Sequence, residues 1–191
     1  LAIHIDNDAT LDLQVSQIFA SLDLDGTITR TAGTSALTVS GPSNLDGSIT
    51  TTGTQTYTGT ITLTADTTLT STGAAITASA IDGGYDLTIV SGAAQSLTNA
   101  IGSSTPLTSI NVSTTSGNLT LANNIAVTGT GTDAMIFNAG SSTAAGTTTG
   151  GNIIISGSPT LTTGTGGRAT FYTGSVSGST GLTSLIGSGT H

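Results

Sequence analysis

The acidic residues near the N-terminus are the side chains most able to do chemistry in this 191-residue chain. Two short clusters stand out, Asp-Asn-Asp at residues 6–8 and Asp-Leu-Asp-Gly at residues 23–26. Calcium takes about six to eight oxygen ligands, and closely spaced Asp and Asn side chains can supply several of them. The candidate calcium ligands are therefore Asp6, Asp8, Asp23 and Asp25.

The complete signature of a calcium loop is missing around these aspartates. An EF-hand loop needs Gly at its sixth position and a closing Glu, and the chain contains no Glu. The Gly-Gly-x-Gly-x-Asp repeat of calcium-binding β-helices is also absent. As the structural alternative, the same Asp side chains end strands and keep an exposed sheet edge soluble. We expect no bound cofactor, with calcium as the minor alternative.

Catalytic sets are equally poorly represented. The two histidines are His4, within an alternating apolar run, and His191, at the end of the chain. No Gly-x-Ser-x-Gly elbow stands between a strand and a helix, so a serine nucleophile is not predicted. Two carboxylates facing each other could cleave a glycosidic bond, and the pairs close in sequence are Asp23 with Asp25 and Asp82 with Asp86. Aromatic residues that could stack on a sugar make up only 3% of the chain, so we expect no enzyme.

The composition restricts the possible partners. Charged residues make up 6% of the chain, against roughly 25% in a typical soluble domain. The chain has ten Asp residues and two cationic residues, Arg30 and Arg168, which gives a net charge of −8. Such an acidic surface repels nucleic acid and anionic lipid. No apolar run approaches the ~20 residues of a membrane span, so no membrane insertion is predicted. Cys is absent, which excludes disulfides and thiolate-bound metals.

The pattern between residues 50 and 92 predicts β-structure. From residue 54 to residue 70 nearly every second position is Thr, and the positions between include Tyr57, Ile61 and Leu63. A period of two is typical of strands, and β-branched Thr favours the extended conformation. Helical periodicity is not sustained anywhere, so the fold class is all-β.

Shorter pulses of the same kind run through the rest of the chain. Residues 1–30 are the most apolar and acidic part, and they contain four short predicted strands at residues 2–5, 11–13, 22–24 and 26–29. The phrase ALTVSG at 36–41 returns as DLTIVSG at 86–92 and more loosely as GNLTLA at 117–122. Internal repeats at such spacings favour a solenoid or an array. No linker divides residues 1–191, which we treat as one segment with residues 1–30 as an N-terminal turn or docking region.

A parallel β-helix, or β-solenoid, accounts best for these strands. Hairpin signals are sparse, and a narrow lumen filled by Ile, Leu, Val and Ala needs few aromatic side chains. With ~20 residues per turn and ~4.8 Å between turns, the chain would form a rod of about nine turns and about 40–45 Å. Strand twist favours right-handed winding. We expect Tyr57, Tyr85 and Tyr172 to cap the lumen or cover the edges of turns.

Four phrases carry a resemblance to a known class of proteins. They are TQTYTGTITLTADTTL at 54–69, AIGSSTPLTSI at 100–110, GTGGRATFY at 164–172 and GSVSGSTGL at 174–182. Together they resemble the repeats of giant β-solenoid surface proteins of Gram-negative bacteria, namely autotransporter passengers and filamentous-haemagglutinin-like two-partner-secretion adhesins. The resemblance covers most of residues 50–190 and is weak over residues 1–30. It implies a secreted rod and supplies no catalytic residues; it also favours right-handed winding.

We therefore expect a non-catalytic structural rod segment of a secreted bacterial cell-surface adhesin or exoprotein. The alternative is a self-assembling extracellular fibre subunit, joined head to tail through its β-edges. A polysaccharide-active β-helix enzyme is the least favoured alternative. The expected partners are other segments of the same exoprotein, copies of the chain itself, and host or matrix glycans.

Overall fold

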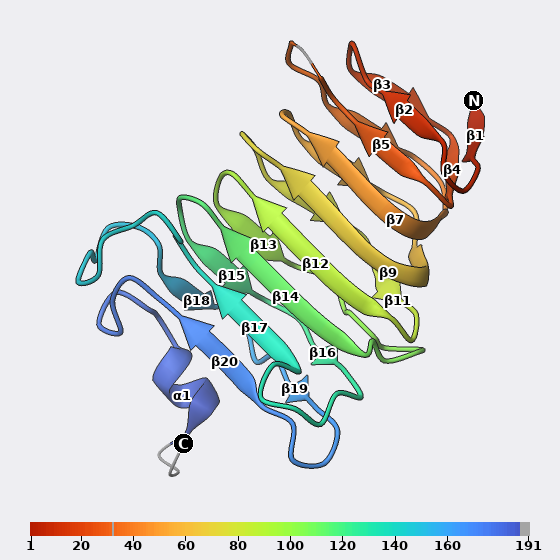
Figure 1. The fold of residues 1–191 in the computed structure, drawn as a ribbon. Coiled ribbons are helices and arrows are strands. Elements are labelled where there is room, and N and C mark those ends of the chain that lie inside the picture. Colours follow the sequence, from red (N-terminus) through yellow and green to blue (C-terminus); the bar gives the residue numbers. More distant parts are fainter. Residues whose placement is uncertain (32, 188–191) are drawn as a thin grey trace.

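The chain folds as a rod of stacked β-strands. The structure is a computed structural model that describes residues 1–31 and 33–187. It is nearly all β, and its parallel sheets form a β-solenoid of about 6 turns. The turns stack from the N-terminus at the upper right of Figure 1 to the C-terminus at the lower left. The prediction of an all-β parallel solenoid is thus confirmed, and the handedness stays a prediction.

The pairing of strands divides each turn into three faces. On the first face, strands stack so that Ile61, Ile81, Ile101 and Ile125 follow one another through ladders and isolated bridges. The strands of this face are β1 (Ala2–Ile5), β4 (Ser21–Leu24), the first parts of β7 (Ser43–Thr51) and β9 (Ile61–Ser71), β11 (Ile81–Asp82), β16 (Ile125–Ala126) and β19 (Leu161–Thr162).

The second face follows directly, because β7 and β9 bend and continue into it (Figure 1). The register of β7 against β9 shifts between Leu45 and Gly47, which places a bulge at the bend. The strands of this face are β2 (Thr10–Asp12), β5 (Thr27–Thr29), the second parts of β7 and β9, β12 (Asp86–Ser91), β14 (Ser109–Thr114), β17 (Met135–Asn138) and β20 (Ala169–Tyr172).

The third face closes each turn. Its strands are β3 (Gln17–Phe19), β6 (Leu37–Val39), β8 (Gln55–Tyr57), β10 (Ile76–Ala78), β13 (Gln95–Leu97), β15 (Leu119–Leu121) and β18 (Ile153–Ile155). The side chain of Gln95 in β13 links this strand to β10 of the preceding turn. Its Oε1 accepts a hydrogen bond from the Ile76 N–H at 2.9 Å, and its Nε2 donates to the Ile76 carbonyl at 2.5 Å.

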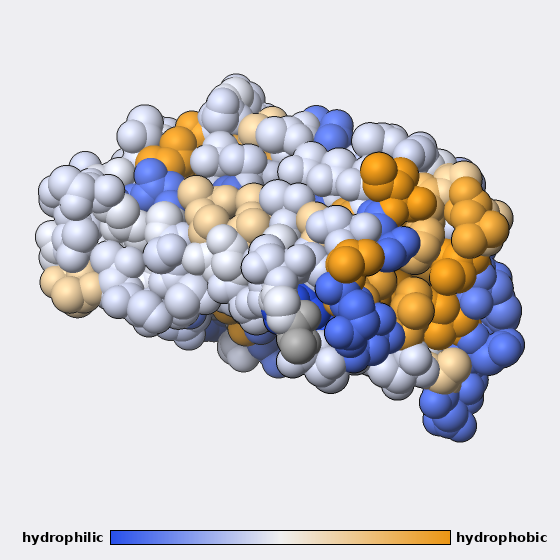
Figure 2. Space-filling view, turned by 90° about the horizontal axis from the view of Figure 1, so that it is seen from above, coloured by the Kyte–Doolittle hydropathy of each residue, from blue (hydrophilic) through white to orange (hydrophobic). Residues whose placement is uncertain are grey.

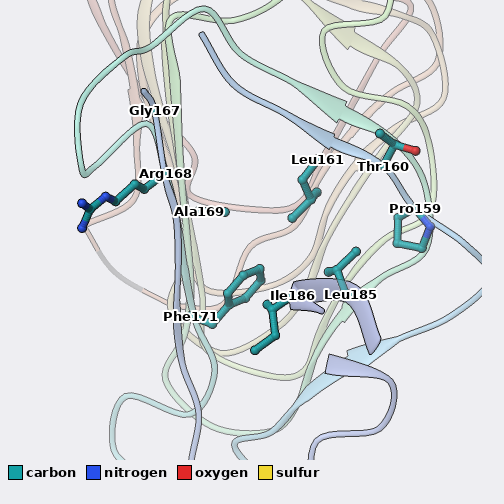
Figure 3. A pocket seen from close by; sticks show the side chains of 9 residues that line it. All are labelled: Pro159, Thr160, Leu161, Gly167, Arg168, Ala169, Phe171, Leu185 and Ile186. Atoms are coloured by element: carbon teal, nitrogen blue, oxygen red, sulfur yellow. The ribbon is translucent and has the colours of Figure 1, made fainter. Parts of the chain in front are cut away.

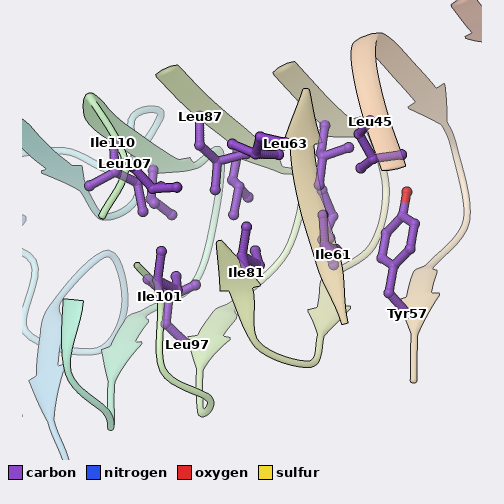
Figure 4. Packing of buried hydrophobic residues seen from close by; sticks show 14 of the residues in the cluster. Leu45, Tyr57, Ile61, Leu63, Ile81, Leu87, Leu97, Ile101, Leu107 and Ile110 are labelled. Carbon is purple, nitrogen blue, oxygen red and sulfur yellow. The ribbon is translucent and has the colours of Figure 1, made fainter. Parts of the chain in front are cut away.

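Alternating burial within each strand produces the lumen. Along β9, Ile61, Leu63, Thr67 and Leu69 are almost completely buried, whereas the other residues between Ile61 and Leu69 are exposed or half-buried. Figure 4 shows such side chains, from successive turns, packed together inside the rod. Because each turn meets the next in register, an inward apolar side chain packs on another one at the level above and below.

The lumen also contains polar groups with partners. Tyr57 points into the core rather than capping it, and its hydroxyl donates to Gln55 Oε1 at 2.9 Å. Tyr85 and Tyr172 are 41% and 54% exposed. The prediction that all three tyrosines cap the lumen or cover edges is therefore wrong for Tyr57, because its ring is buried among the apolar side chains of the core and its hydroxyl has a partner there.

A column of buried hydroxyls ends the second-face strands. Its members are Thr51, Ser71, Ser91 and Thr114, each 0% exposed. Thr51 and Thr114 donate to carbonyls just beyond their own strands, as Thr114 does to Gly117 at 3.1 Å, whereas Ser71 and Ser91 donate to carbonyls of the preceding turn. Thr114 also accepts the buried Gly140 N–H at 2.7 Å. The hydroxyls thus satisfy backbone groups where the chain leaves the sheet.

The lengths of the turns differ more than the sequence suggested, and the prediction of about nine turns was wrong. Ser43 pairs with Ile61, whereas Phe137 pairs with Phe171, so later turns contain much longer loops. The second face has eight stacked strands, and at ~4.8 Å per step they span about 34 Å.

Two further features differ from simple repetition. The similar phrases at 36–41, 86–92 and 117–122 contain β6, β12 and β15, which lie on the third, second and third faces, so the phrase does not mark one structural repeat. The apolar alternation that makes it recognisable is needed on every face. The chain then ends its described part in a short helix, α1 (Leu182–Ile186), which the strand periodicity did not predict.

Candidate functional surfaces

The predicted calcium ligands gather around an imidazole at the first turn. β1 and β4 pair so that His4 lies opposite Asp23, and His4 Nδ1 is 3.0 Å from Asp23 Oδ2. On the other side of the ring, His4 Nε2 is 3.0 Å from Asp6 Oδ1 and 3.9 Å from Asp25 Oδ2. Asp8 lies outside this group, and its N–H bonds to Asn7 Oδ1.

The aspartates favour the protonated, positively charged form of the His4 imidazole. The hydrogen bond that the ring donates to Asp6 raises the pKa of His4 above its ordinary value of 6.5, the one to Asp23 adds to the rise, and desolvation opposes it. Across the described residues, no group of three or more His, Cys, Asp or Glu side chains has the arrangement to hold a metal ion. Calcium binding at these aspartates stays a prediction.

A second acidic contact joins the first two turns. Asp12 accepts hydrogen bonds from the Thr31 N–H at 3.0 Å, from the Thr31 hydroxyl, and from Gln14 Nε2 at 2.6 Å. The Thr31 hydroxyl contributes most to lowering the pKa of Asp12. This carboxylate stabilises a corner of the rod.

The carboxylates weighed for glycosidic chemistry hold neighbouring loops. Asp82 Oδ1 accepts from the N–H groups of Ser104 at 2.7 Å and Thr105 at 3.1 Å. Asp86 Oδ1 accepts from the Ser109 hydroxyl at 2.7 Å. Asp23 is engaged by His4, as described above. Each of these groups has a structural partner in an adjacent turn, and His191 lies outside the described residues.

The second face presents a regular array of hydroxyls to solvent. Two outward rows run along β5, β7, β9 and β12, and their hydroxyl-bearing members are Thr27, Thr29, Ser48, Thr50, Thr68, Thr70 and Thr88. Within the described part of the chain these hydroxyls make no hydrogen bond. Neighbours lie ~4.8 Å apart between strands and about 6.6 Å apart along a strand. The array is uncharged, which suits weak contacts to other polar, uncharged surfaces.

The C-terminal end of the lumen contains a cavity of about 650 Å³. Figure 3 shows its apolar lining, which includes Leu161, Ala169, Phe171, Leu185 and Ile186. Phe171 stacks on Phe137 with ring centroids 5.4 Å apart, so it continues the core column. The Arg168 side chain points away from the cavity (Figure 3).

Comparisons with known proteins leave these surfaces without a precedent. No family model, curated protein or solved structure matches the chain. In the described part of the chain, no helix reaches the length and hydrophobicity needed to cross a membrane.

Proposed function

We propose that this chain is a non-catalytic rod segment of a secreted bacterial cell-surface adhesin or exoprotein. The observation that carries the proposal is the continuous lumen, in which inward side chains stack from Leu11 to Phe171 along one face. Such a ladder makes a stiff spacer whose length depends on the number of turns. The resemblance of four phrases to the repeats of autotransporter passengers and two-partner-secretion adhesins supports an extracellular location.

The surface chemistry supports the same proposal. An acidic rod with two arginines has little attraction for nucleic acid or anionic lipid, and its hydroxyl face suits weak contacts with host or matrix glycans. The partners at the ends of the rod would be other segments of the same exoprotein or copies of the chain itself. The aspartates considered for catalysis are engaged with adjacent turns, which favours a structural role over polysaccharide cleavage.

The location can be tested on intact cells. Antibodies against the purified chain should label intact cells of the source organism, at a distance from the outer surface, and mild protease treatment should remove the label. An antibody to a cytoplasmic protein serves as the control for lysis. Labelling that requires permeabilised cells would contradict the proposal.

A further inference from the structure

Among the described strands, those at the two ends of the rod each have one unpaired edge. β1 and β2 each pair only with the following turn, and β19 and β20 each pair only with the preceding turn, among the described strands. Figure 2, seen from above, shows apolar side chains gathered at the N-terminal end of the rod, at its right, with hydrophilic residues around them. Leu1, Val15 and Ile18 are among the exposed large apolar residues there, at 86%, 62% and 72%. Open edges with apolar surroundings template further strands.

We propose that the C-terminal end of the rod is a docking site for the first turn of a second copy of this chain. In the docked pair, β1 of the second copy would add to β19 and β2 would add to β20. The contact is heterologous, so repetition gives an open filament. The proposal concerns the isolated chain and does not depend on where the protein acts.

The register of the lumen fits this contact. Leu11 and Phe171 are the two ends of one inward column on the second face, which runs Leu11, Ile28, Ile49, Leu69, Ile89, Val112, Phe137 and Phe171. Ile3 and Leu161 are likewise the two ends of the first-face column. A second copy that continues the stack would therefore place its Leu11 over Phe171 and its Ile3 over Leu161.

The C-terminal cavity has the place and lining for these side chains. Leu161, Ala169 and Phe171 form its wall on the first and second faces, each half-buried. In the interior turns, the corresponding space is filled by side chains of the next turn, as Phe171 itself covers Phe137. Ile3 and Leu11, both incompletely buried in one copy, would fill it and lose their contact with water.

Charge is complementary at the edge of the same contact. Thr10 and Thr170 are the first and last members of one column of outward-facing residues on the second face. Asp8 lies two residues before Thr10, and Arg168 lies two residues before Thr170, so the two charged residues occupy equivalent positions at opposite ends of the rod. Both charged side chains are exposed, and within the described residues neither takes part in an ion pair. Docking would bring the Asp8 carboxylate of one copy beside the Arg168 guanidinium of the other.

The helix α1 restricts the contact to two faces. The Ile155 N–H of β18 donates to the Thr180 carbonyl at 2.8 Å, and Leu182 at the start of α1 is only 4% exposed. α1 thus takes the third-face position of the last turn, the turn that contains β19 and β20. β3 of the second copy would meet this helix and not a strand edge, so strand pairing between the copies is limited to the first and second faces.

Sedimentation velocity of the full chain over a concentration series tests the proposal. Wild type should associate end to end as concentration rises. Arg168→Asp and Asp8→Arg should each weaken association by roughly three- to tenfold, and the double variant should recover it. Asp66→Arg, an exposed site in the middle of the rod with the same change in net charge as Asp8→Arg, is the control and should not weaken it.

Two outcomes would overturn the proposal. One is a wild type that stays monomeric at every concentration, with circular dichroism showing folded protein. The other is association that Asp66→Arg weakens as much as Asp8→Arg does, since the assay would then report net charge and not the contact. Electron micrographs of associating samples should show thin filaments with ~4.8 Å axial periodicity, and side-by-side dimers would also contradict it.

Discussion

Threonine has two different roles in this chain, and the side of the strand decides between them. Thr114 is buried and bonded to two backbone groups, whereas Thr70 points outward and its hydroxyl makes no hydrogen bond within the described residues. Thr→Val keeps the shape and removes only the hydroxyl. A comparison of Thr→Val at the two positions therefore separates the contribution of the buried hydrogen bonds to stability from the contribution of β-propensity.

Thr114→Val should destabilise the protein by about 1–3 kcal/mol, because the Gly140 N–H and the Gly117 carbonyl lose their partner inside the fold. Thr70→Val should change the free energy of unfolding by less than about 0.5 kcal/mol. Urea unfolding followed by circular dichroism measures both. Equal effects at the two positions would contradict the structural role of the buried hydroxyl column.

Tyr57 should make the protein sensitive to alkali. Burial raises the pKa of Tyr57 far above its ordinary value of 10.0. Above pH 10 the unfolded chain loses this proton and the folded chain keeps it, so the free energy of unfolding falls with rising pH, by up to about 1.4 kcal/mol per pH unit. Tyr57→Phe should remove this pH dependence while costing about 1–3 kcal/mol at neutral pH through the unpaired Gln55 Oε1. A melting temperature that is equally alkali-sensitive in both proteins would contradict this explanation.

His4 reports on the acidic cluster. Its pKa should lie above 6.5, and Asp6→Asn should lower it, since the Asp6 hydrogen bond is the largest cause of the rise. The stabilisation is present below pH 6.5 and is lost as pH rises through the folded-state pKa. NMR titration of the imidazole measures this value, and we expect added calcium to leave it unchanged. A fall in the pKa on adding calcium would show that the ion binds at the candidate aspartates.

At the scale of the element, the bend between the first and second faces depends on glycine. Gly47 has φ of 115°, and a Cβ there would lie 2.2 Å from the Gly26 carbonyl oxygen of the preceding turn. Both the backbone conformation and the close approach of two turns exclude a side chain. The bulge thus needs glycine both for its backbone conformation and for the short distance between the two turns.

Gly47→Ala should therefore destabilise the protein by at least about 1–3 kcal/mol. Gly84→Ala is the matched control, because its φ is not positive and no atom lies within 4 Å of a Cβ at that position. We expect no loss of stability there, since Ala also reduces the entropy of the unfolded chain. Thermal unfolding compares the two, and an equal loss at both positions would argue against the close approach.

The whole molecule should tolerate loss of one turn if the deletion is in register. Thr67 pairs with Leu87, so deleting residues 68–87 joins Thr67 to Thr88 in phase. We expect a folded rod shorter by ~4.8 Å, because every remaining turn still meets a neighbour of the same kind. Deleting residues 68–77 removes about half a turn and should abolish cooperative unfolding, since inward positions then fall on the wrong face.

Small-angle X-ray scattering and circular dichroism distinguish these deletions. Normal β-signal and a shorter rod for the 68–87 deletion, together with loss of structure for the 68–77 deletion, would agree with the solenoid. Equal tolerance of both deletions would show that the turns do not depend on register.

The sequence alone determined the local structure and the fold class. Alternation of Thr with Ile and Leu between residues 54 and 70 specifies strands, and the scarcity of hairpin signals favours parallel pairing, because both signals are carried by neighbouring residues. The strands at residues 2–5, 11–13, 22–24 and 26–29 correspond to β1, β2, β4 and β5. β3 was missed because its two apolar residues, Ile18 and Phe19, are adjacent and lie on opposite sides of the strand, so no alternation of apolar with polar residues marks it.

Which residues contact each other between turns became visible in the three-dimensional structure. The length of each turn depends on loops that have no periodicity, so the gathering of Asp6, Asp23 and Asp25 around His4 could not be derived from spacing. The same holds for the alignment of Asp8 with Arg168 at opposite ends of the rod. In a solenoid, the residues that meet between two turns depend on the lengths of all the preceding turns. A change in the length of one loop therefore changes which residues of the later turns lie next to each other.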